Sequence, residues 1–174
     1  MNTDKICIFT NKGQMHLLKV LDLPYGKFRD KGIPIDNLSN YNSSEENFVY
    51  ITNLGAILHS KVFFGTKMAM LKMVDGSEFD VAKRTTAATK LNDEDELLIV
   101  HAVSEDETIV MQSEKDMFLR IEASTVPEKK KGAVGVRGMK LAAGDTLSNI
   151  YLLGNESEQT IEVKGKEVVL NRLR

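Results

Sequence analysis

Clusters of lysine and arginine are the residues of this sequence best suited to chemistry. They are Lys27, Arg29 and Lys31, then Lys83 and Arg84, then Lys129, Lys130 and Lys131. Cationic side chains bind phosphate through charge-assisted hydrogen bonds, and several acting together release counterions from a nucleic acid. The clusters, together with Arg137, therefore predict a surface that contacts phosphates. Isolated strand cations are more often merely solvated, and they form a second tier of candidates: Lys12, Lys19, Lys72 and Arg120.

The net charge does not by itself favour a polyanionic partner. The 174 residues include 23 Lys and Arg against 25 Asp and Glu, which gives a formal net charge of −2. The acidic residues gather elsewhere, at residues 45–46, 93–96 and 105–107 and at Asp145. A fold that segregates the two signs would give this near-neutral chain a positive strip.

Residue types that could support catalysis are present but not arranged for it. His16, His59 and His101 lie far apart and have no Cys or carboxylate at metal-ligand spacing, so each is interpreted as a surface histidine or a satisfied strand histidine. The glycine-rich residues 132–138 do not have the spacing of a dinucleotide fingerprint, and no nucleophile elbow or Walker loop is present. We expect no catalytic residue, no metal site and no cofactor in this chain.

The single cysteine and the amino-terminal residues bear on the compartment. Cys7 has no partner for an intramolecular disulfide or a cysteine-based zinc cluster. The start of the sequence lacks a signal-peptide pattern, and no stretch approaches the roughly 18 apolar residues that a membrane span needs. These features predict a cytoplasmic protein without a membrane partner.

Short apolar runs separated by turn residues predict an all-β fold that would position the cations. In the first hairpin, residues 10–13 join the runs 6–9 and 15–20, and Asn11 and Gly13 suit the positive φ angles of a tight turn. Three further hairpins are expected, pairing residues 62–64 with 70–73, 109–111 with 117–121, and 160–163 with 167–170.

The hairpins recur with a period of about 50 residues, which is typical of propeller-like arrays. The residues that close the turns, at separations of 56, 47 and 49, are Gly13, Ala69, Asp116 and Gly165. One lysine of each basic cluster stands 14 residues after its turn residue: Lys27, Lys83 and Lys130. The repeat therefore predicts that the basic clusters occupy equivalent places in successive units.

Several motifs resemble the carboxy-terminal β-pinwheel domain of the A subunits of bacterial DNA gyrase and topoisomerase IV. They include ICIFTNKG at residues 6–13, KGIPIDNL at 31–38 and GVRGMKL at 135–141, and the resemblance covers most of residues 5–170. It implies an all-β, propeller-like array of three blades and the start of a fourth. The corresponding units are about 5–46, 47–97, 98–150 and 151–174.

The resemblance also implies a function for the basic clusters. A positively charged perimeter would bind and bend duplex DNA without reading its sequence, and present it for strand passage by an ATP-dependent type II topoisomerase near the nucleoid. ATP, Mg²⁺ and strand cleavage would then belong to the ATPase B subunit of an A2B2 enzyme and to the rest of its A subunit. With no Trp, four Tyr and seven Phe, the chain offers few aromatics for stacking on single strands, which also favours duplex DNA.

Alternatives remain beside this interpretation. The glycine-rich basic heptapeptide that marks gyrase has only a weak match at residues 129–135. The resemblance therefore does not imply a direction of DNA wrapping. A propeller-like protein-interaction module would leave the basic clusters as solvated loops without a DNA role. A small β-rich enzyme would rest on the scattered histidines alone. Open blade edges also predict that the chain associates with itself.

Overall fold

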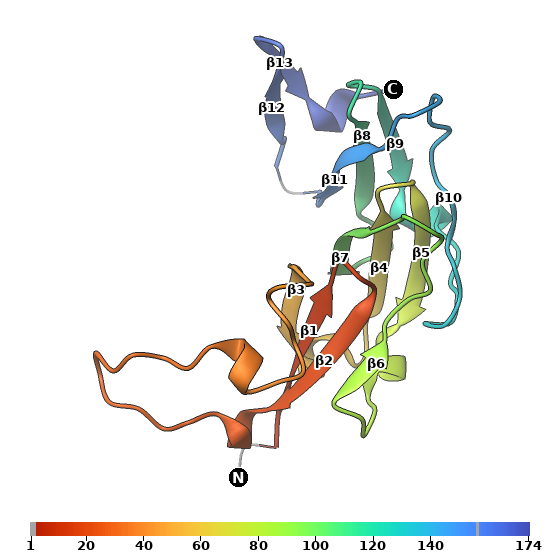
Figure 1. Ribbon diagram of the computed structural model, residues 1–174. Coiled ribbons are helices and arrows are strands. Elements are labelled where there is room, and N and C mark those ends of the chain that lie inside the picture. The colour runs from red at the N-terminus through yellow and green to blue at the C-terminus, as the bar shows by residue number, and fades with distance from the viewer. Residues whose placement is uncertain (1–2, 156) are drawn as a thin grey trace.

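The computed structural model describes residues 3–155 and 157–174, whose strands form four antiparallel sheets arranged one after another (Figure 1). The first sheet contains, in spatial order, β3 (Phe48–Asn53), β1 (Lys5–Thr10), β2 (Gln14–Lys19) and β6 (Thr85–Ala87). The second contains β10 (Val136–Arg137), β5 (Met70–Asp75), β4 (Lys61–Thr66) and β7 (Leu97–Val103). The third contains β11 (Leu147–Leu153), β8 (Thr108–Ser113) and β9 (Phe118–Glu122), and the fourth β12 (Thr160–Val163) and β13 (Lys166–Val169).

The predicted all-β class is confirmed, because the helical elements are single turns that lie between strands or after the last one. They are α1 (Leu54–Ile57) and the 3-10 turns η1 (Val20–Asp22), η2 (Ile35–Asn37), η3 (Gly76–Phe79), η4 (Ala123–Thr125) and η5 (Leu170–Arg172). None of the helices among the described residues has both the length and the hydrophobicity required to traverse a bilayer.

All four predicted hairpins are present, as β1–β2, β4–β5, β8–β9 and β12–β13. The four residues that define the repeat share one backbone conformation, since φ is +76° at Gly13, +61° at Ala69, +56° at Asp116 and +74° at Gly165. This left-handed conformation gives the tight turn a twist that matches the paired strands. The period of about 50 residues in the sequence therefore corresponds to the same left-handed turn recurring in each hairpin.

The first three sheets each gain strands from beyond their hairpin. β3, β7 and β11 pair with β1, β4 and β8, and the outer edges of β2 and β5 pair with β6 and β10 from the following unit. The sheets thus differ from the consecutive units expected from the sequence: β3 falls within 47–97 yet completes the first sheet. The exchange gives hydrogen-bond partners to edges that a consecutive unit would leave open.

The hydrophobic core runs between neighbouring sheets. Phe79 of η3 is fully buried and lies edge-on to Phe9 of β1, with 5.2 Å between ring centroids, while it stacks on Phe64 of β4. The same cluster includes Met15 and Val100 from the first and second sheets. A second cluster, with Phe63 and Met111 among its members, joins the second sheet to the third. Aromatic packing between sheets fixes the places of the segments that cross from one sheet to the next.

Candidate nucleic-acid interface

The first basic cluster lies on an arm, residues 23–34, that leaves the sheets and projects to the left in Figure 1. Lys27, Arg29 and Lys31 are exposed there. The Lys27 backbone N–H donates to Asp30 Oδ2 at 2.6 Å, and the Asp30 N–H donates to the Lys27 carbonyl at 3.0 Å, so the cluster sits on a closed turn. Arg29 has φ +75° at this turn. The arm therefore presents its cations away from the other two clusters.

Aromatic residues alternate with these cations, which the sequence interpretation missed. Tyr25 and Phe28 are almost fully exposed, and the Arg29 guanidinium lies 5.4 Å from the Phe28 ring centroid. The signal was present in the residue order from 25 to 31, where aromatic and basic residues are interleaved. Counting aromatics over the whole chain concealed it.

The second cluster lies beside the first sheet, where β6 pairs with β2. Lys83 and Arg84 line a groove of about 400 Å³ together with Lys19 of β2 and Lys5 of β1. Lys5 and Lys19 face one another across the hairpin. The Arg84 guanidinium also donates to the Leu38 carbonyl at 3.1 Å, which holds this side chain near the groove.

Four cations thus converge on this groove, which we call the basic groove. Lys19, a second-tier candidate, is brought together with Lys83 and Arg84, and Lys5 is an addition that the sequence interpretation missed. The signal was available, because a Lys at each end of the first predicted hairpin becomes a cross-strand pair once the register is known. Asp22 also lines the groove, so the local charge is mixed but predominantly positive.

The third cluster occupies residues 129–133, which we call the basic loop, beside the second sheet. Lys129 and Lys130 are exposed, while the Lys131 ammonium donates to the Glu78 carbonyl at 3.2 Å. Arg137 is exposed on β10, and Gly135 lies directly against β5, where a Cβ would come 2.5 Å from the Leu71 carbonyl oxygen. Figure 1 shows β6 and β10 on the same side of the array, so the second and third clusters follow one flank.

The prediction that Lys72 contacts phosphate on the surface is wrong. Lys72 is only 1% exposed, and its ammonium donates to the carbonyls of Lys130, Lys131 and Ala133. Burial lowers the pKa of Lys72 to about 8. Alternation along the strand placed this side chain under the basic loop, which lies about 60 residues further along the chain.

The other second-tier cations occupy ordinary surface positions. Lys12 pairs with Glu96 at 3.2 Å, and Lys67 pairs with the same carboxylate at 2.8 Å. Hydrogen bonds from Lys67 and Lys12 hold the pKa of Glu96 below its usual range. Arg120 is exposed and donates to the Asn171 carbonyl. Lys12 and Arg120 thus engage partners within the chain.

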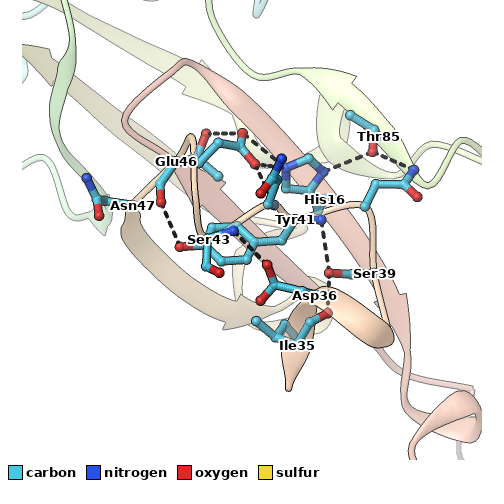
Figure 2. A network of polar contacts seen from close by, with 12 residues as sticks. His16, Ile35, Asp36, Ser39, Tyr41, Ser43, Glu46, Asn47 and Thr85 are labelled. Atoms are coloured by element: carbon cyan, nitrogen blue, oxygen red, sulfur yellow. Dashed lines mark hydrogen bonds and ion pairs between the residues drawn. The ribbon is translucent and has the colours of Figure 1, made fainter. Parts of the chain in front are cut away.

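A buried polar network around His16 organises the base of the arm (Figure 2). His16 is 3% exposed, with Nε2 2.9 Å from Glu46 Oε2 and Nδ1 2.9 Å from Thr85 Oγ1. Thr10 donates to Glu46 Oε1 at 3.0 Å, and Asn40 donates to Thr85 Oγ1 at 2.9 Å. Since Asn40 supplies a proton to Thr85, the Thr85 hydroxyl can donate to Nδ1 while Nε2–H donates to Glu46.

Hydroxyl, imidazole and carboxylate follow one another here in the order used by nucleophilic enzymes, but burial closes the imidazole to a substrate. The network instead joins β1, β2 and β6 to the loop before β3. The interpretation of His16 as a satisfied strand histidine is confirmed. Within residues 3–155 and 157–174, no group of three or more His, Cys, Asp or Glu side chains could hold a metal ion.

Comparison with known proteins identifies the family. The family described as "DNA gyrase C-terminal domain, beta-propeller" matches residues 60–104 and 107–153. The chain is 31% identical over 159 residues to the DNA gyrase A subunit of Lawsonia intracellularis, covering 90% of this chain and 19% of that protein. The corresponding gyrase protein of Staphylococcus epidermidis is 30% identical over 166 residues, with 92% and 18% covered. The chain thus spans about a fifth of the length of these relatives.

Solved structures agree in fold. The C-terminal domain of DNA topoisomerase IV has a TM-score of 0.84 at 22% identity, over 91% of this chain and 50% of that one. The E. coli ParC C-terminal domain has a TM-score of 0.80 at 12% identity, over 97% and 69%. The repeated hairpins, the exchanged strands and the sequence matches lead to one conclusion: the chain belongs to the DNA gyrase C-terminal domain family of beta-propellers.

Proposed function

We propose that this chain binds duplex DNA through phosphate contacts, without reading sequence, within the A subunit of a type IIA topoisomerase. The observation that carries the proposal is the similar placement of two basic segments, one before β6 beside the first sheet and one before β10 beside the second. Each follows the outer edge of a hairpin, where β6 and β10 pair. Cations that recur at the spacing of the blades can follow a phosphate backbone around the array.

The phosphate contacts of this proposal are the four cations of the basic groove, the exposed lysines of the basic loop, Arg137 and the arm cations. Bending of the DNA is part of the proposal, because contacts to cations on successive blades would offset the energy of deforming the duplex. The chain has no catalytic step in this proposal. Strand cleavage, ATP and Mg²⁺ are assigned to the remaining domains of an A2B2 enzyme of the bacterial cytoplasm, those of its ATPase B subunit included.

Charge reversal tests the proposal directly. We expect the Lys83→Glu, Arg84→Glu double variant and the Lys129→Glu, Lys130→Glu double variant each to weaken duplex binding about tenfold or more in about 100 mM salt, because each removes two phosphate contacts and adds repulsion. Binding is measured by fluorescence anisotropy with two duplexes of unrelated sequence. Lys166→Glu, on β13, is the matched control with an exposed lysine and should change binding little. Equal affinity in all four proteins would refute the assignment.

A second candidate, a protein-interaction role, is favoured by the arm. Besides Tyr25 and Phe28, the arm exposes Leu23 and Ile33, and Leu21 is exposed just before it on η1. Exposed apolar residues of this kind are typical of contacts with another protein surface. If Tyr25→Ser and Phe28→Ser leave DNA affinity unchanged but abolish association with the other domains of the topoisomerase, the arm serves that contact rather than DNA.

A further inference from the structure

Two buried polar side chains occupy equivalent positions on the second strand of successive hairpins. His16 on β2 and Lys72 on β5 each lie three residues after the left-handed turn residue, Gly13 and Ala69 respectively. Both are almost completely buried, at 3% and 1% exposure. Neither is needed to form the hairpin itself, since the third hairpin has Leu119 at the same position. Their contacts show what they have in common.

Lys72 uses its ammonium to gather the basic loop. Nζ lies 3.1 Å from the Lys130 carbonyl oxygen, 3.0 Å from that of Lys131 and 2.8 Å from that of Ala133. An ammonium has three N–H donors, and these three acceptors can use all of them. Nζ also lies 5.3 Å from the centroid of the Phe64 ring, on the neighbouring strand β4.

Three carbonyls of a short segment converge on one donor only if the segment is curled around it. When those carbonyls point inward, the side chains of the loop are free to point outward, and Lys129 and Lys130 are exposed. The charged group that faces Lys72 is the Glu78 carboxylate on η3, since Lys130 and Lys131 present their carbonyls to it. The loop is itself tied to η3, where the Lys131 N–H donates to Glu78 Oε1 at 3.4 Å.

His16 makes the corresponding contact one blade earlier. Its Nδ1 lies 2.9 Å from the hydroxyl of Thr85, the first residue of β6, which directly follows Lys83 and Arg84. In both cases a buried side chain of one hairpin bonds to the chain contributed by the next unit. Lys72 bonds to the basic loop itself, and His16 bonds to β6, directly after Lys83 and Arg84.

We propose that Lys72, and His16 in the preceding blade, are positioning residues for phosphate binding that hold the basic segment of the following unit in its outward-facing conformation. The DNA-binding consequence rests on the function proposed above. The anchoring of the loop does not, and it can be measured without DNA.

The first experiment follows the basic loop by amide hydrogen exchange in the whole chain. Lys72→Met removes the ammonium but keeps an unbranched apolar stem, and Lys166→Met is the control. We expect the amides of Lys129 and Ala133, bonded to the carbonyls of Met73 and Lys130, to exchange about tenfold or more faster in Lys72→Met only. Unchanged exchange in a folded Lys72→Met variant overturns the proposal.

A titration of the unaltered protein decides the matter if Lys72→Met does not fold. The carbonyl ¹³C shifts of Lys130, Lys131 and Ala133 should move with the same midpoint, near pH 8, as the ¹³Cε shift of Lys72, because a neutral amine has only two N–H donors. Carbonyl shifts that stay constant through the Lys72 titration contradict the anchoring role.

The second experiment measures DNA affinity against salt for Lys72→Met, for the Lys129→Ala, Lys130→Ala, Lys131→Ala variant, and for the two combined. If Lys72 acts through the loop, Lys72→Met makes the negative slope of log affinity against log salt shallower by about 2, and the combined variant binds no more weakly than the triple one. A full slope with additive losses indicates a merely structural role and overturns the proposal. Absence of DNA binding by the unaltered protein would refute the proposed function, while the exchange result would still decide the anchoring.

Discussion

At the scale of single residues, burial rather than residue type separates the cations that can reach a phosphate from those that cannot. Lys83 and Lys72 both belong to the second repeat unit, yet Lys83 lines the basic groove and Lys72 is only 1% exposed. The sequence identifies both as cations. It does not identify what covers Lys72, because the covering carbonyls belong to residues 130–133, far along the chain. Local alternation predicts which side of a strand a residue faces, but not what a distant segment places there.

Cys7 gives a residue-scale prediction with a definite sign. Burial raises the pKa of its thiol from about 9 to about 12. Between these values the unfolded chain releases a proton that the folded chain keeps, so the free energy of unfolding should fall as the pH rises from about 9 toward 12. Urea unfolding of the unaltered protein and of Cys7→Ala at pH 8 and pH 10 measures the effect. A pH dependence as steep in Cys7→Ala as in the unaltered protein would assign it to other groups.

At the scale of elements, the hairpins were predictable and their pairing into sheets was not. Turn chemistry at Gly13 and Gly165 and apolar runs of strand length are local signals, and all four hairpins are confirmed. The pairing of β6 with β2 joins residues about 70 apart, and β10 pairs with β5 at a similar separation. Strands as short as β6 and β10 have no periodic signal of their own, so only the completed array defines them.

The turns give a pair of opposite predictions for the free energy of unfolding. Ala69 holds φ +61° with a Cβ that the left-handed region disfavours, so Ala69→Gly should stabilise the fold by up to about 1 kcal/mol. Gly13 holds φ +76°, and a Cβ there would lie 3.1 Å from the Thr89 carbonyl oxygen, so Gly13→Ala should destabilise by about 1 to 2 kcal/mol. Chemical denaturation measures both. Effects of the same sign for the two variants would contradict the shared turn geometry.

At the scale of the whole molecule, the exchange of strands leaves, within residues 3–155 and 157–174, a segment that joins no sheet and a sheet edge that no strand covers. In the described residues, β9 is the last strand of its sheet, and the arm, which corresponds to the segments before β6 and β10, projects from the first sheet. Gly32 stands at the same distance after its turn residue as Gly135, whose lack of a side chain permits close approach to β5. We therefore expect the arm of one copy to pair with an open sheet edge of another.

Substitution of a glycine in the arm can test self-association without disturbing the fold. A Cβ at Gly32 meets nothing within 4 Å, so Gly32→Val should leave the fold intact and reduce self-association severalfold in light scattering over a range of protein concentrations. Gly154→Val is the control, since its Cβ also meets nothing within 4 Å. A monomer at all concentrations for the unaltered protein, or equal loss in both variants, would exclude pairing through the arm.

The charge distribution is the whole-molecule property on which the proposed function depends. A net charge of −2 predicts no affinity for DNA, whereas the basic groove and the basic loop place cations along one flank, as the phase of the lysines in the sequence predicts. The most direct test is the dependence of affinity on salt for two duplexes of unrelated sequence. Binding through phosphate contacts alone predicts equal affinities for the two duplexes, and a fall in affinity of several hundredfold or more between about 50 and 200 mM salt if about five phosphates are neutralised. Affinity that is independent of salt, or that differs strongly between the two sequences, would contradict it.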